Sequence, residues 1–562
     1  MKHIVFLTLS LIFQAPFFVG AQKLALHNEA TVNTIQSNGF TLNWQLNQKA
    51  NAWVEWSATH TNQTGTMQLG EQQENFRWIF REGEPARFYQ VTFFAANQND
   101  TLKSGPFLYT TRALSTGEIK VYFNHEVEHA VATQTPANYL NKLVDDTLIA
   151  YLNRAKQTID IAIYNSSTAN SLSNIAAALN SARTRGVQVR MVYDESSSNT
   201  MIPNVSSQIG KIKSKVRNFT YGLMHNKFVV IDADAENPND ALVWTGSTNW
   251  TVDQLNGPDE NNVIILQDQA LARAYKLEFE EMFGSTGPQP NEANAKFGPD
   301  KTNNTPHEFN IGGRRVRSYF SPSDGANAQI IGVINSAGYD LEFASMVITR
   351  FDIANAITNR VSNGLTETYG VIDDSTQVDQ VAEWNQLKGA LRFGRMTSNN
   401  GFAGIMHHKF VIADATAPGS DPQVLTGSHN WSTSAETKND ENTLIIHDAD
   451  IANQYYQAFS WLFKRYTGRT VGISPMALPQ TLWQVFPNPA ASSIQLKRTD
   501  NSNSQQVQVR LSDLGGQTIR QLSGTGSTHS IQVDVAELNA GIYLLEVVTG
   551  QERAVFRVAV AR

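Results

Sequence analysis

One chemically distinctive pattern occurs twice in the chain. Each copy has a histidine, a lysine two positions later and an aspartate five further on, then a Gly-Ser-x-Asn-Trp turn and a Glu-Asn pair. His225 and His407 are 182 positions apart, whereas Gly246 and Gly427 are 181 apart. Since so small a drift across so many matched positions indicates an internal duplication, the central part of the chain is predicted to fold as two similar halves.

The segments around both copies alternate between strand and helix. Residues 159–164 and 187–193 are apolar runs typical of buried strands, and residues 171–185 between them have helical periodicity. The second half repeats this order over residues 341–372. Such alternation predicts a layered α/β fold in each half.

The first 21 residues have the composition of a signal peptide. A basic start precedes an apolar run at residues 4–13, and residues 19–21 are small enough for cleavage. The run is shorter than the ~20 apolar residues that span a bilayer. We therefore expect export, and we expect no transmembrane segment here or later in the chain.

Residues 23–112 contain short alternating apolar runs separated by Asn-, Gly- and Gln-rich turns, which predicts an all-β sandwich. Tyr89 stands where such a sandwich often has its tyrosine corner. In this pattern the segment resembles a fibronectin type III domain. A spacer or substrate-presenting role is expected for it.

Residues 483–562 also predict a small β-sandwich. They contain Phe486-Pro487-Asn488-Pro489, a Leu-Ser-Asp-Leu-Gly-Gly segment and the strand-like runs 541–547 and 554–561. This order of motifs resembles the type A sorting domain of the type IX secretion system; the alternative is a generic adhesive domain. The resemblance implies the type IX secretion machinery as a partner and a secreted or cell-surface location.

Pro-, Gly- and Asn-rich connectors divide the rest of the chain. They are predicted at residues 285–310 and 468–482, which leaves the two halves at residues 118–284 and 311–467. The chain has no cysteine, so disulfides, thiolate metal sites and a cysteine nucleophile are excluded.

The duplicated histidines and lysines suit phosphate chemistry. If residues 224–231 form a strand, His225 and Lys227 project from one face, and His407 and Lys409 do the same. A lysine binds a phosphate oxygen, and an imidazole attacks phosphorus or transfers a proton. An imidazole beside a fixed cation is a poor site for a divalent metal, so no metal and no other cofactor is predicted.

The Gly-Ser-x-Asn turn supplies further groups for the same anion. Its glycine lets the backbone approach closely, its serine offers a hydroxyl for substrate binding, and its asparagine offers an amide. The residues of the two turns are Gly246, Ser247 and Asn249, and Gly427, Ser428 and Asn430.

Two kinds of carboxylate accompany each copy. Glu260 and Glu441 each follow the turn asparagine by 11 residues and are predicted to hold each imidazole by its second nitrogen. Asp232 and Asp414 are predicted to hold the local loop together, without touching substrate.

The complete pattern is the HKD signature, and residues 118–466 resemble the phospholipase D superfamily. Its members bring two motifs together, so the resemblance implies a monomer in which both halves build one site at a pseudo-twofold interface. The expected fold is a multidomain chain with a central α/β pseudo-dimer of two α-β-α layered halves, flanked by all-β sandwich domains. The gaps of 13 and 12 residues between each aspartate and the following glycine are about twice the usual family length and predict longer hairpin loops.

The resemblance also implies a two-step displacement. His225 attacks a phosphodiester to form a phosphohistidine, and His407 protonates the leaving alcohol and then activates water. The lysines and asparagines neutralise the oxygens of the transition state. Nothing in the sequence distinguishes the two histidines, so their roles are exchangeable.

The charge balance favours a phospholipid as the substrate. Residues 117–470 contain 29 Lys and Arg against 38 Asp and Glu, a net charge of −9, whereas long polyanions bind through phosphate neutralisation. Small basic clusters at residues 211–217 and 314–317 keep a metal-independent secreted nuclease as the alternative, with nucleic acid as its partner. A third hypothesis, an inactive HKD-fold binding or adhesion protein, is opposed by the completeness of both motifs.

Overall fold

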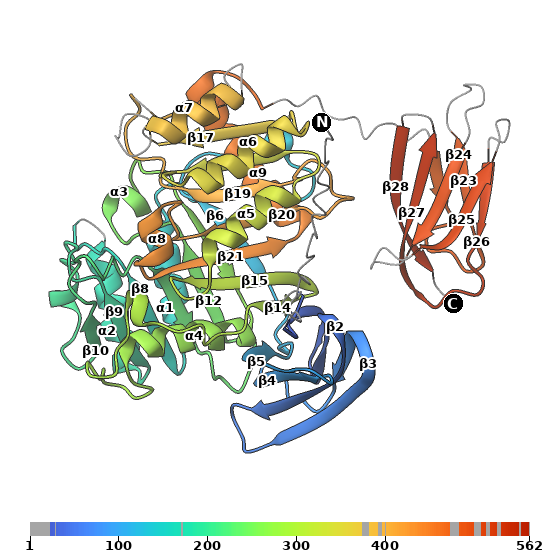
Figure 1. The fold of residues 1–562 in the computed structure, drawn as a ribbon. Coiled ribbons are helices and arrows are strands. Elements are labelled where there is room, and N and C mark those ends of the chain that lie inside the picture. Colours follow the sequence, from blue (N-terminus) through green and yellow to red (C-terminus); the bar gives the residue numbers. More distant parts are fainter. Residues whose placement is uncertain are drawn as a thin grey trace, which may run out of the picture. The chain divides into compact units, whose positions relative to one another are not determined.

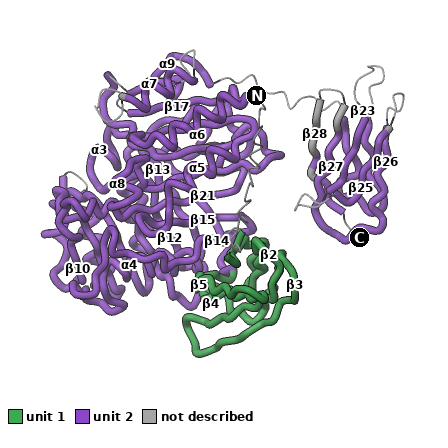
Figure 2. Tube along the Cα trace, viewed as in Figure 1, with its two compact units in different colours: residues 1–111 green, residues 112–562 purple. Residues whose placement is uncertain are grey.

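The computed structural model describes residues 23–27, 30–169, 172–373, 381–391, 396–399, 401–471, 483–498, 507–512, 518–524, 530–549 and 552–560. The predicted signal peptide lies outside these ranges. The chain divides into two units, Met1–Thr111 and Arg112–Arg562 (Figure 2). Among the described residues, no helix combines the length and apolar character needed to cross a membrane.

The N-terminal unit is all-β, as predicted. Its antiparallel sheet has the order β1-β2-β4-β5, and β3 pairs with β2 (Figure 1). The strands are β1 (Thr31–Gln36), β2 (Gly39–Ala58), β3 (Thr64–Phe80), β4 (Phe88–Ala96) and β5 (Thr101–Thr110).

The short apolar runs expected as separate strands include residues 41–44 and 52–56, and both are parts of the single long strand β2. Register shifts between Gln45 and Trp53 let β2 stay paired with β3 across the polar stretch that looked like a turn. The buried Tyr89 accepts a hydrogen bond from the Glu84 amide (2.8 Å), the arrangement expected of a tyrosine corner. The finer fibronectin type III resemblance stays a prediction.

The first half of the α/β body has an eight-stranded sheet in the order β10-β9-β8-β11-β12-β13-β6-β7. Its elements are β6 (Ile119–Phe123), β7 (Asn138–Tyr139), α1 (Val144–Arg154), β8 (Thr158–Ile163), α2 (Ser173–Thr184), β9 (Gln188–Tyr193), β10 (Gly210–Lys213), β11 (Lys227–Ile231), β12 (Leu242–Gly246), α3 (Val252–Leu255), β13 (Asn262–Leu266) and α4 (Gln269–Phe283).

The second half repeats this order as β18-β17-β16-β19-β20-β21-β15-β14. Its elements are β14 (Glu308–Ile311), β15 (Arg314–Ser321), α5 (Ala326–Ser336), β16 (Leu341–Ser345), α6 (Phe351–Ser362), β17 (Thr368–Ile372), α7 (Val381–Ala390), β18 (Met396–Ser398), β19 (Lys409–Ala413), β20 (Gln423–Gly427), α8 (Thr433–Thr437), β21 (Glu441–His447) and α9 (Ala449–Thr467). The prediction of two related α/β halves is confirmed.

Each half closes with an amphipathic helix whose ends the sequence specifies. The carboxylates of Asp268 and Asp448 cap α4 and α9 by accepting from backbone amides of the first turn. Gly284 and Gly468 end these helices in the left-handed conformation. Because Gly468 is the stop signal, α9 continues to Thr467.

These two helices also join the halves. Tyr275 of α4 packs edge-on against Phe320 of the second half (4.9 Å between ring centroids), and Tyr455 of α9 packs against Phe123 of the first half (5.3 Å). Asn262 Nδ2 of the first half donates a hydrogen bond to the Tyr455 hydroxyl oxygen (2.6 Å). The halves therefore share a buried seam.

The predicted connector at 285–310 packs against this seam. Lys301 is buried, pairs with Glu278 and lies 3.5 Å from Asp440, while the amide of Gly298 donates to Asp440 Oδ1 (2.8 Å). The connector ends inside β14, which starts at Glu308. The polar residues of the connector therefore form buried ion pairs and hydrogen bonds as well as turns.

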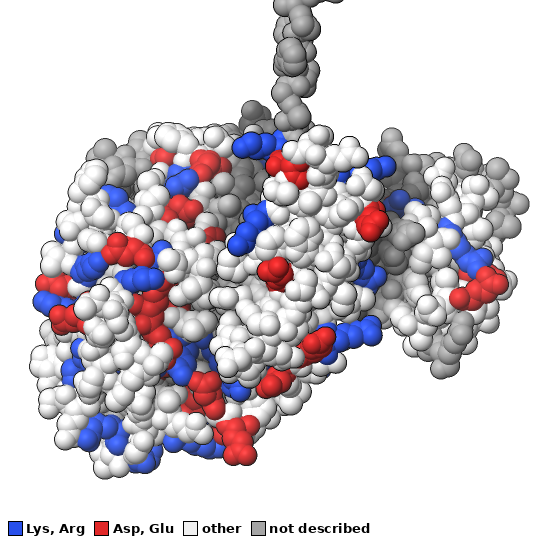
Figure 3. Space-filling model, turned by 60° about the horizontal axis from the view of Figure 1, so that its bottom comes forward, with Lys and Arg blue, Asp and Glu red and all other residues white. Residues whose placement is uncertain are grey.

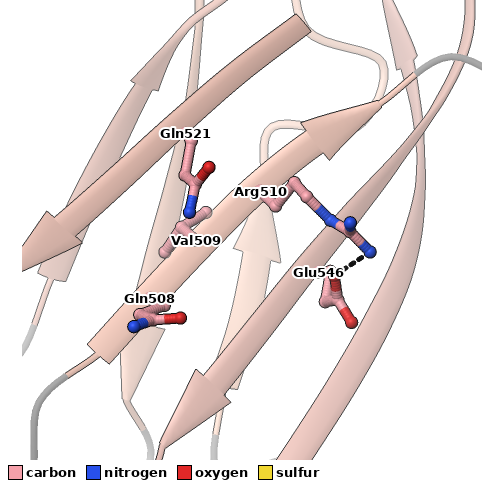
Figure 4. A pocket seen from close by; sticks show the side chains of 5 residues that line it. All are labelled: Gln508, Val509, Arg510, Gln521 and Glu546. Carbon is pink, nitrogen blue, oxygen red and sulfur yellow. Dashed lines mark ion pairs between the residues drawn. The ribbon is translucent and has the colours of Figure 1, made fainter. Parts of the chain in front are cut away.

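The C-terminal domain is a β-sandwich, as predicted. One sheet has the order β22-β23-β26 and the other β25-β24-β27-β28, and both contribute to one apolar core. Figure 4 shows the ion pair between Arg510 and Glu546 (2.6 Å), on neighbouring strands, beside a shallow pocket. The strands are β22 (Trp483–Phe486), β23 (Ser493–Arg498), β24 (Val507–Ser512), β25 (Thr518–Gly524), β26 (Ser530–Asp534), β27 (Gly541–Thr549) and β28 (Glu552–Val560).

Candidate active site

The two histidines of the repeated motif are held by the backbone of the opposite half. The amide of His225 donates to the Asp440 carbonyl, and that of His407 donates to the Glu260 carbonyl, both at 2.9 Å. The expected strand at 224–231 is shorter, since β11 begins only at Lys227. The residues before it leave the sheet to pair across the seam.

A carboxylate of the second half supports the histidine of the first. His225 Nδ1 lies 2.7 Å from Glu441 Oε2, and both side chains are buried. Burial opposes the negative charge, but the His225 imidazole and Lys227 hold the pKa of Glu441 below its ordinary value. Burial also lowers the pKa of His225, although Glu441 opposes this shift. A neutral His225 therefore donates from Nδ1 and keeps the Nε2 lone pair for chemistry.

A neutral amide occupies the corresponding place in front of His407. His407 Nδ1 lies 2.9 Å from Asn261 Oδ1. Asn261 Nδ2 donates to the Asp259 carbonyl (3.3 Å), so the amide oxygen is the atom that faces the imidazole. Because that oxygen only accepts, His407 carries its hydrogen on Nδ1. Burial, followed by the nearby Lys409, Lys227 and His225, keeps the pKa of His407 well below its ordinary value.

Glu260, predicted with Glu441 to hold the imidazoles, forms its side-chain contacts elsewhere. Its carboxylate accepts a hydrogen bond from the Tyr466 hydroxyl and pairs with Arg465 Nε (3.3 Å). Burial raises its pKa to about 7. In the structure, Glu260 therefore ties the end of α9 to the seam, and only its backbone carbonyl contacts His407.

A further one-residue drift explains this difference. Gly246 pairs with Val263 in the first half, whereas Gly427 pairs with Thr443 in the second. The two partners are 180 positions apart, although the glycines are 181 apart. Asn261 is consequently the structural counterpart of Glu441. The sequence comparison aligned Glu260 with Glu441 instead, which concealed this one-residue shift.

Both lysines are buried beside their histidines. Lys227 Nζ donates to the His225 carbonyl and Lys409 Nζ to the His407 carbonyl, each at 2.7 Å. Burial lowers the pKa of Lys227 to about 7 and, with Lys227 nearby, lowers that of Lys409 well below its ordinary value. An anion entering between the lysines restores their charged forms, so the site is electrostatically suited to a phosphate.

The turn residues differ in what they offer a ligand. The side-chain oxygens of Asn249 and Asn430 are buried without a hydrogen-bond partner among the described residues. Ser247 Oγ already donates to Asn261 Oδ1 (2.9 Å), whereas Ser428 Oγ accepts from the Asn442 amide (3.0 Å). Ser247 is therefore a support for Asn261, which differs from the substrate-binding role predicted for it.

Gly246 and Gly427 are required by close backbone contacts. Their φ angles are 143° and 146°, and a Cβ at either position would lie 2.3 or 2.2 Å from the carbonyl oxygen of Asn262 or Asn442. Those same asparagines cross the seam: Asn442 accepts from Thr245, and Asn262 donates to Thr426, both at 2.8 Å. A β-carbon would displace this network.

The motif aspartates bind backbone loops. Asp232 accepts hydrogen bonds of 2.8 Å from three successive amides, those of Lys156, Gln157 and Thr158. Asp414 does the same with the amides before β16, including that of Gly338 at 2.8 Å. Neither carboxylate forms a hydrogen bond or ion pair with a described motif histidine or lysine, which fits the loop-holding role predicted for them.

Two contributors had no clear sequence signal. The Tyr164 ring lies 4.7 Å from the His225 ring, and Lys227 Nζ lies 5.1 Å from its centroid. Behind the second motif, His408 Nε2 lies 2.8 Å from His125 Nε2. Tyr164 stands at the end of an ordinary apolar strand, and His125 lies 283 positions from its partner. Within the described ranges, no cluster of three or more His, Asp or Glu side chains is arranged to hold a metal.

Comparison with known proteins agrees with this geometry. The family described as "Cardiolipin synthase, PLD-like domain" matches residues 148–283 and 330–463, one copy in each half. A mitochondrial cardiolipin hydrolase from Xenopus tropicalis is 32% identical over 160 residues, which are 28% of this chain and 67% of the relative. The chain belongs to the phospholipase D superfamily. The two halves and their motifs indicate a phosphodiesterase.

Other matches cover a similar share of the chain. A phospholipase D from Rickettsia bellii is 25% identical over 27% of this chain and 69% of its own. The solved structure of Nuc, a phospholipase D family member from Salmonella typhimurium, is 24% identical and covers 28% of this chain and 96% of its own, with a TM-score of 0.24. The matches span only 45 to 70% of the length of the curated relatives.

The C-terminal domain has a separate match. Residues 484–561 match the family described as "Secretion system C-terminal sorting domain". The predicted type IX sorting domain is therefore present, and it indicates export to the cell surface or the medium.

The contrast between the two glutamates is directly testable. Glu441→Gln removes the charge behind His225 and is expected to lower kcat/KM on bis(p-nitrophenyl) phosphate by about 100-fold. Glu260→Gln is the matched control, since that side chain contacts neither histidine, and it should leave kcat/KM nearly unchanged. Equal losses in the two variants would contradict the observed register.

Proposed function

We propose that this protein is an exported phosphodiesterase that hydrolyses a phospholipid through a covalent phosphohistidine intermediate. The observation that carries the proposal is the pair of buried lysines beside two differently supported imidazoles. The His225–Glu441 hydrogen bond of 2.7 Å spans the two halves, so one polypeptide supplies the whole site. Such a pocket stabilises a phosphoryl group that is bound covalently by one imidazole while the other imidazole transfers protons.

In the first step, His225 is the nucleophile. Its Nε2 lone pair attacks phosphorus and forms an N–P bond, while Glu441 stabilises the positive charge that develops on the ring. The bond between phosphorus and the leaving oxygen breaks, and that oxygen takes a proton from His407 Nε2. The bound diester carries the negative charge that favours this protonated form of His407.

In the second step, the same groups act in reverse. Neutral His407 removes a proton from water, the water oxygen attacks phosphorus, and the N–P bond breaks. His225 returns to its neutral form, and the products are a phosphomonoester and an alcohol. Lys227, Lys409, Asn249 and Asn430 are placed to stabilise the nonbridging oxygens in both steps.

Several observations support a phospholipid as the substrate. The relatives include proteins named mitochondrial cardiolipin hydrolase and phospholipase D. On the face drawn in Figure 3, acidic and basic side chains are interspersed, without a broad basic area. A long polyanion depends on such an area.

The two basic clusters also have internal partners. Lys213 and Lys215 pair with Glu195 (3.6 Å) and with Asp300. Arg314 and Arg315 pair with Asp448 and Glu308, each at 2.6 Å. Four of the seven cations in these clusters are therefore paired with carboxylates, which reduces the charge available to nucleic acid and keeps the nuclease as the second candidate.

The substrate class is decided by one comparison. The full chain, in EDTA, is incubated with vesicles of phosphatidylcholine or cardiolipin and separately with single- and double-stranded DNA. We expect release of the head-group alcohol from a phospholipid, and its loss by about 10³-fold or more in His225→Ala. DNA cleavage without lipid hydrolysis would replace the substrate while keeping the mechanism. A folded protein inactive on every substrate would favour a binding role.

The unequal support of the histidines predicts a shift in pH dependence. Protonation of the leaving group needs His407 in its charged form, so kcat/KM falls as pH rises through the pKa of His407. Asn261→Asp places a carboxylate at Nδ1 and raises that pKa, which moves the basic limb of the profile to higher pH. A short-chain, water-soluble phosphatidylcholine is the substrate, because its alkyl leaving group needs the proton. Glu260→Gln is the control, and its pH profile should match that of the parent. If the basic limb of the kcat/KM profile stays at the same pH in Asn261→Asp, His407 is excluded as the acid.

A further inference from the structure

The loops around the candidate site all lie at one end of the two sheets. β8, β9 and β10 are parallel, and β11 is antiparallel to β8. The loop from β10 to β11 therefore connects strand ends on the side where His225 lies. The second half repeats this arrangement, so the loop before β19 and the turn after β16 lie at the equivalent end beside His407.

This end carries exposed apolar side chains. Phe219 is 91% exposed, in the loop that precedes His225, and Phe351 is 57% exposed, after β16. Large exposed apolar groups in a water-soluble domain mark an interaction surface. We name these side chains the rim residues: Val216, Phe219, Phe351, Phe402 and Ile405.

The two loops are fixed beside the seam. The Gly222 amide donates to the Lys438 carbonyl of the opposite half (3.2 Å), and the Ile405 amide donates to Asp259 Oδ1 (2.9 Å). Points related by a twofold rotation lie at the same height along its axis, so the pseudo-symmetry places both loops at one level around the histidines. The loops that carry Val216, Phe219, Phe402 and Ile405 therefore lie beside the site, and Phe351 follows β16 at the same end of its sheet.

Cations accompany the exposed rings. Lys438 Nζ lies 4.8 Å from the Phe219 ring centroid, and Arg465 Cζ lies 5.0 Å from that of Phe402. Arg217, in the same loop as Phe219, is exposed. Over the described part of the chain, neither Lys438 nor Arg217 forms an ion pair with a carboxylate. Arg465 also pairs with Glu260, so the uncompensated cations are Lys438 and Arg217. Phenyl rings beside such cations complement an anionic lipid surface.

We propose that the rim residues dock the protein on an anionic phospholipid bilayer, with the apolar side chains in the interfacial region and the cations at the head groups. This inference rests on the proposed phospholipid activity and names the physical form of its substrate. Single-stranded nucleic acid also stacks on phenyl rings. The aliphatic Val216 and Ile405 have no face for stacking, which favours the bilayer.

Binding is measured without turnover by using the full chain with His225→Ala. This variant is sedimented with phosphatidylcholine vesicles that contain or lack phosphatidylglycerol, and the bound fraction is measured. The same measurement is made for Phe219→Ala/Phe402→Ala in the His225→Ala background. We expect preference for the anionic vesicles and about a tenfold or larger loss of binding in the double variant. Tyr339→Ala is the matched control, because Tyr339 is 55% exposed but precedes β16 and so lies at the opposite end of the sheet. Vesicle binding by this variant should be unchanged.

The same substitutions are then made in the active chain. Turnover of bis(p-nitrophenyl) phosphate should stay constant, while hydrolysis of vesicle phospholipid falls with binding. Equal vesicle binding by the parent, rim and control variants would overturn docking, even if phospholipid is hydrolysed. Rim-dependent binding without any phospholipid hydrolysis would leave docking standing and remove the proposed function. Rim-dependent binding of single-stranded DNA, with none to vesicles, would overturn the bilayer as the partner.

Discussion

The active centre depends on charge compensation across the seam. Two lysines and two histidines are buried together, and the described carboxylate in direct contact with a motif histidine is that of Glu441. Glu441 belongs to the second half, whereas His225 belongs to the first. Neither half alone therefore has a compensated site, because an isolated first half would bury its imidazole and lysine without this carboxylate. Reciprocal bonds from Asn262 and Asn442 hold the halves in the register that this pairing needs.

The two halves differ in the residue that supports the motif histidine: Glu441 faces His225, whereas Asn261 faces His407. A one-residue drift before β13 places Asn261 opposite His407 and turns Glu260 toward Tyr466 and Arg465. A carboxylate makes the imidazole it supports more basic, whereas a neutral amide only fixes its orientation. The symmetric fold thus supports two histidines with different properties, which is what a nucleophile and an acid require.

Sequence reasoning predicted the parts that local patterns determine. The period of the apolar runs indicated the strands and helices of both halves. Motif spacing placed each histidine beside its lysine, and the resemblance to the phospholipase D superfamily implied that His225, Lys227, His407 and Lys409 form one site. A glutamate was predicted behind each imidazole, without an assignment of either glutamate to a histidine. Glu441 does support His225. The prediction is wrong for His407, which faces Asn261, because two glutamates at equal spacing hid a shift that the pairing of Gly246 with Val263 reveals. The burial of Lys301 was missed for a related reason: its carboxylate partners are far away in sequence.

The central claim is that His225, supported by Glu441, is the nucleophile and His407 is the acid and base. The most direct test is to quench the enzyme in alkali, in which a histidine–phosphorus bond is stable, during turnover of a phospholipid. The trapped phosphatidyl group, or the glycerophosphoryl group that remains after alkaline deacylation, is then mapped by peptide mass spectrometry. This account predicts the adduct on His225, with more of it trapped when Asn261→Asp slows the second step. An adduct on His407, with His225 unmodified, would contradict the assignment.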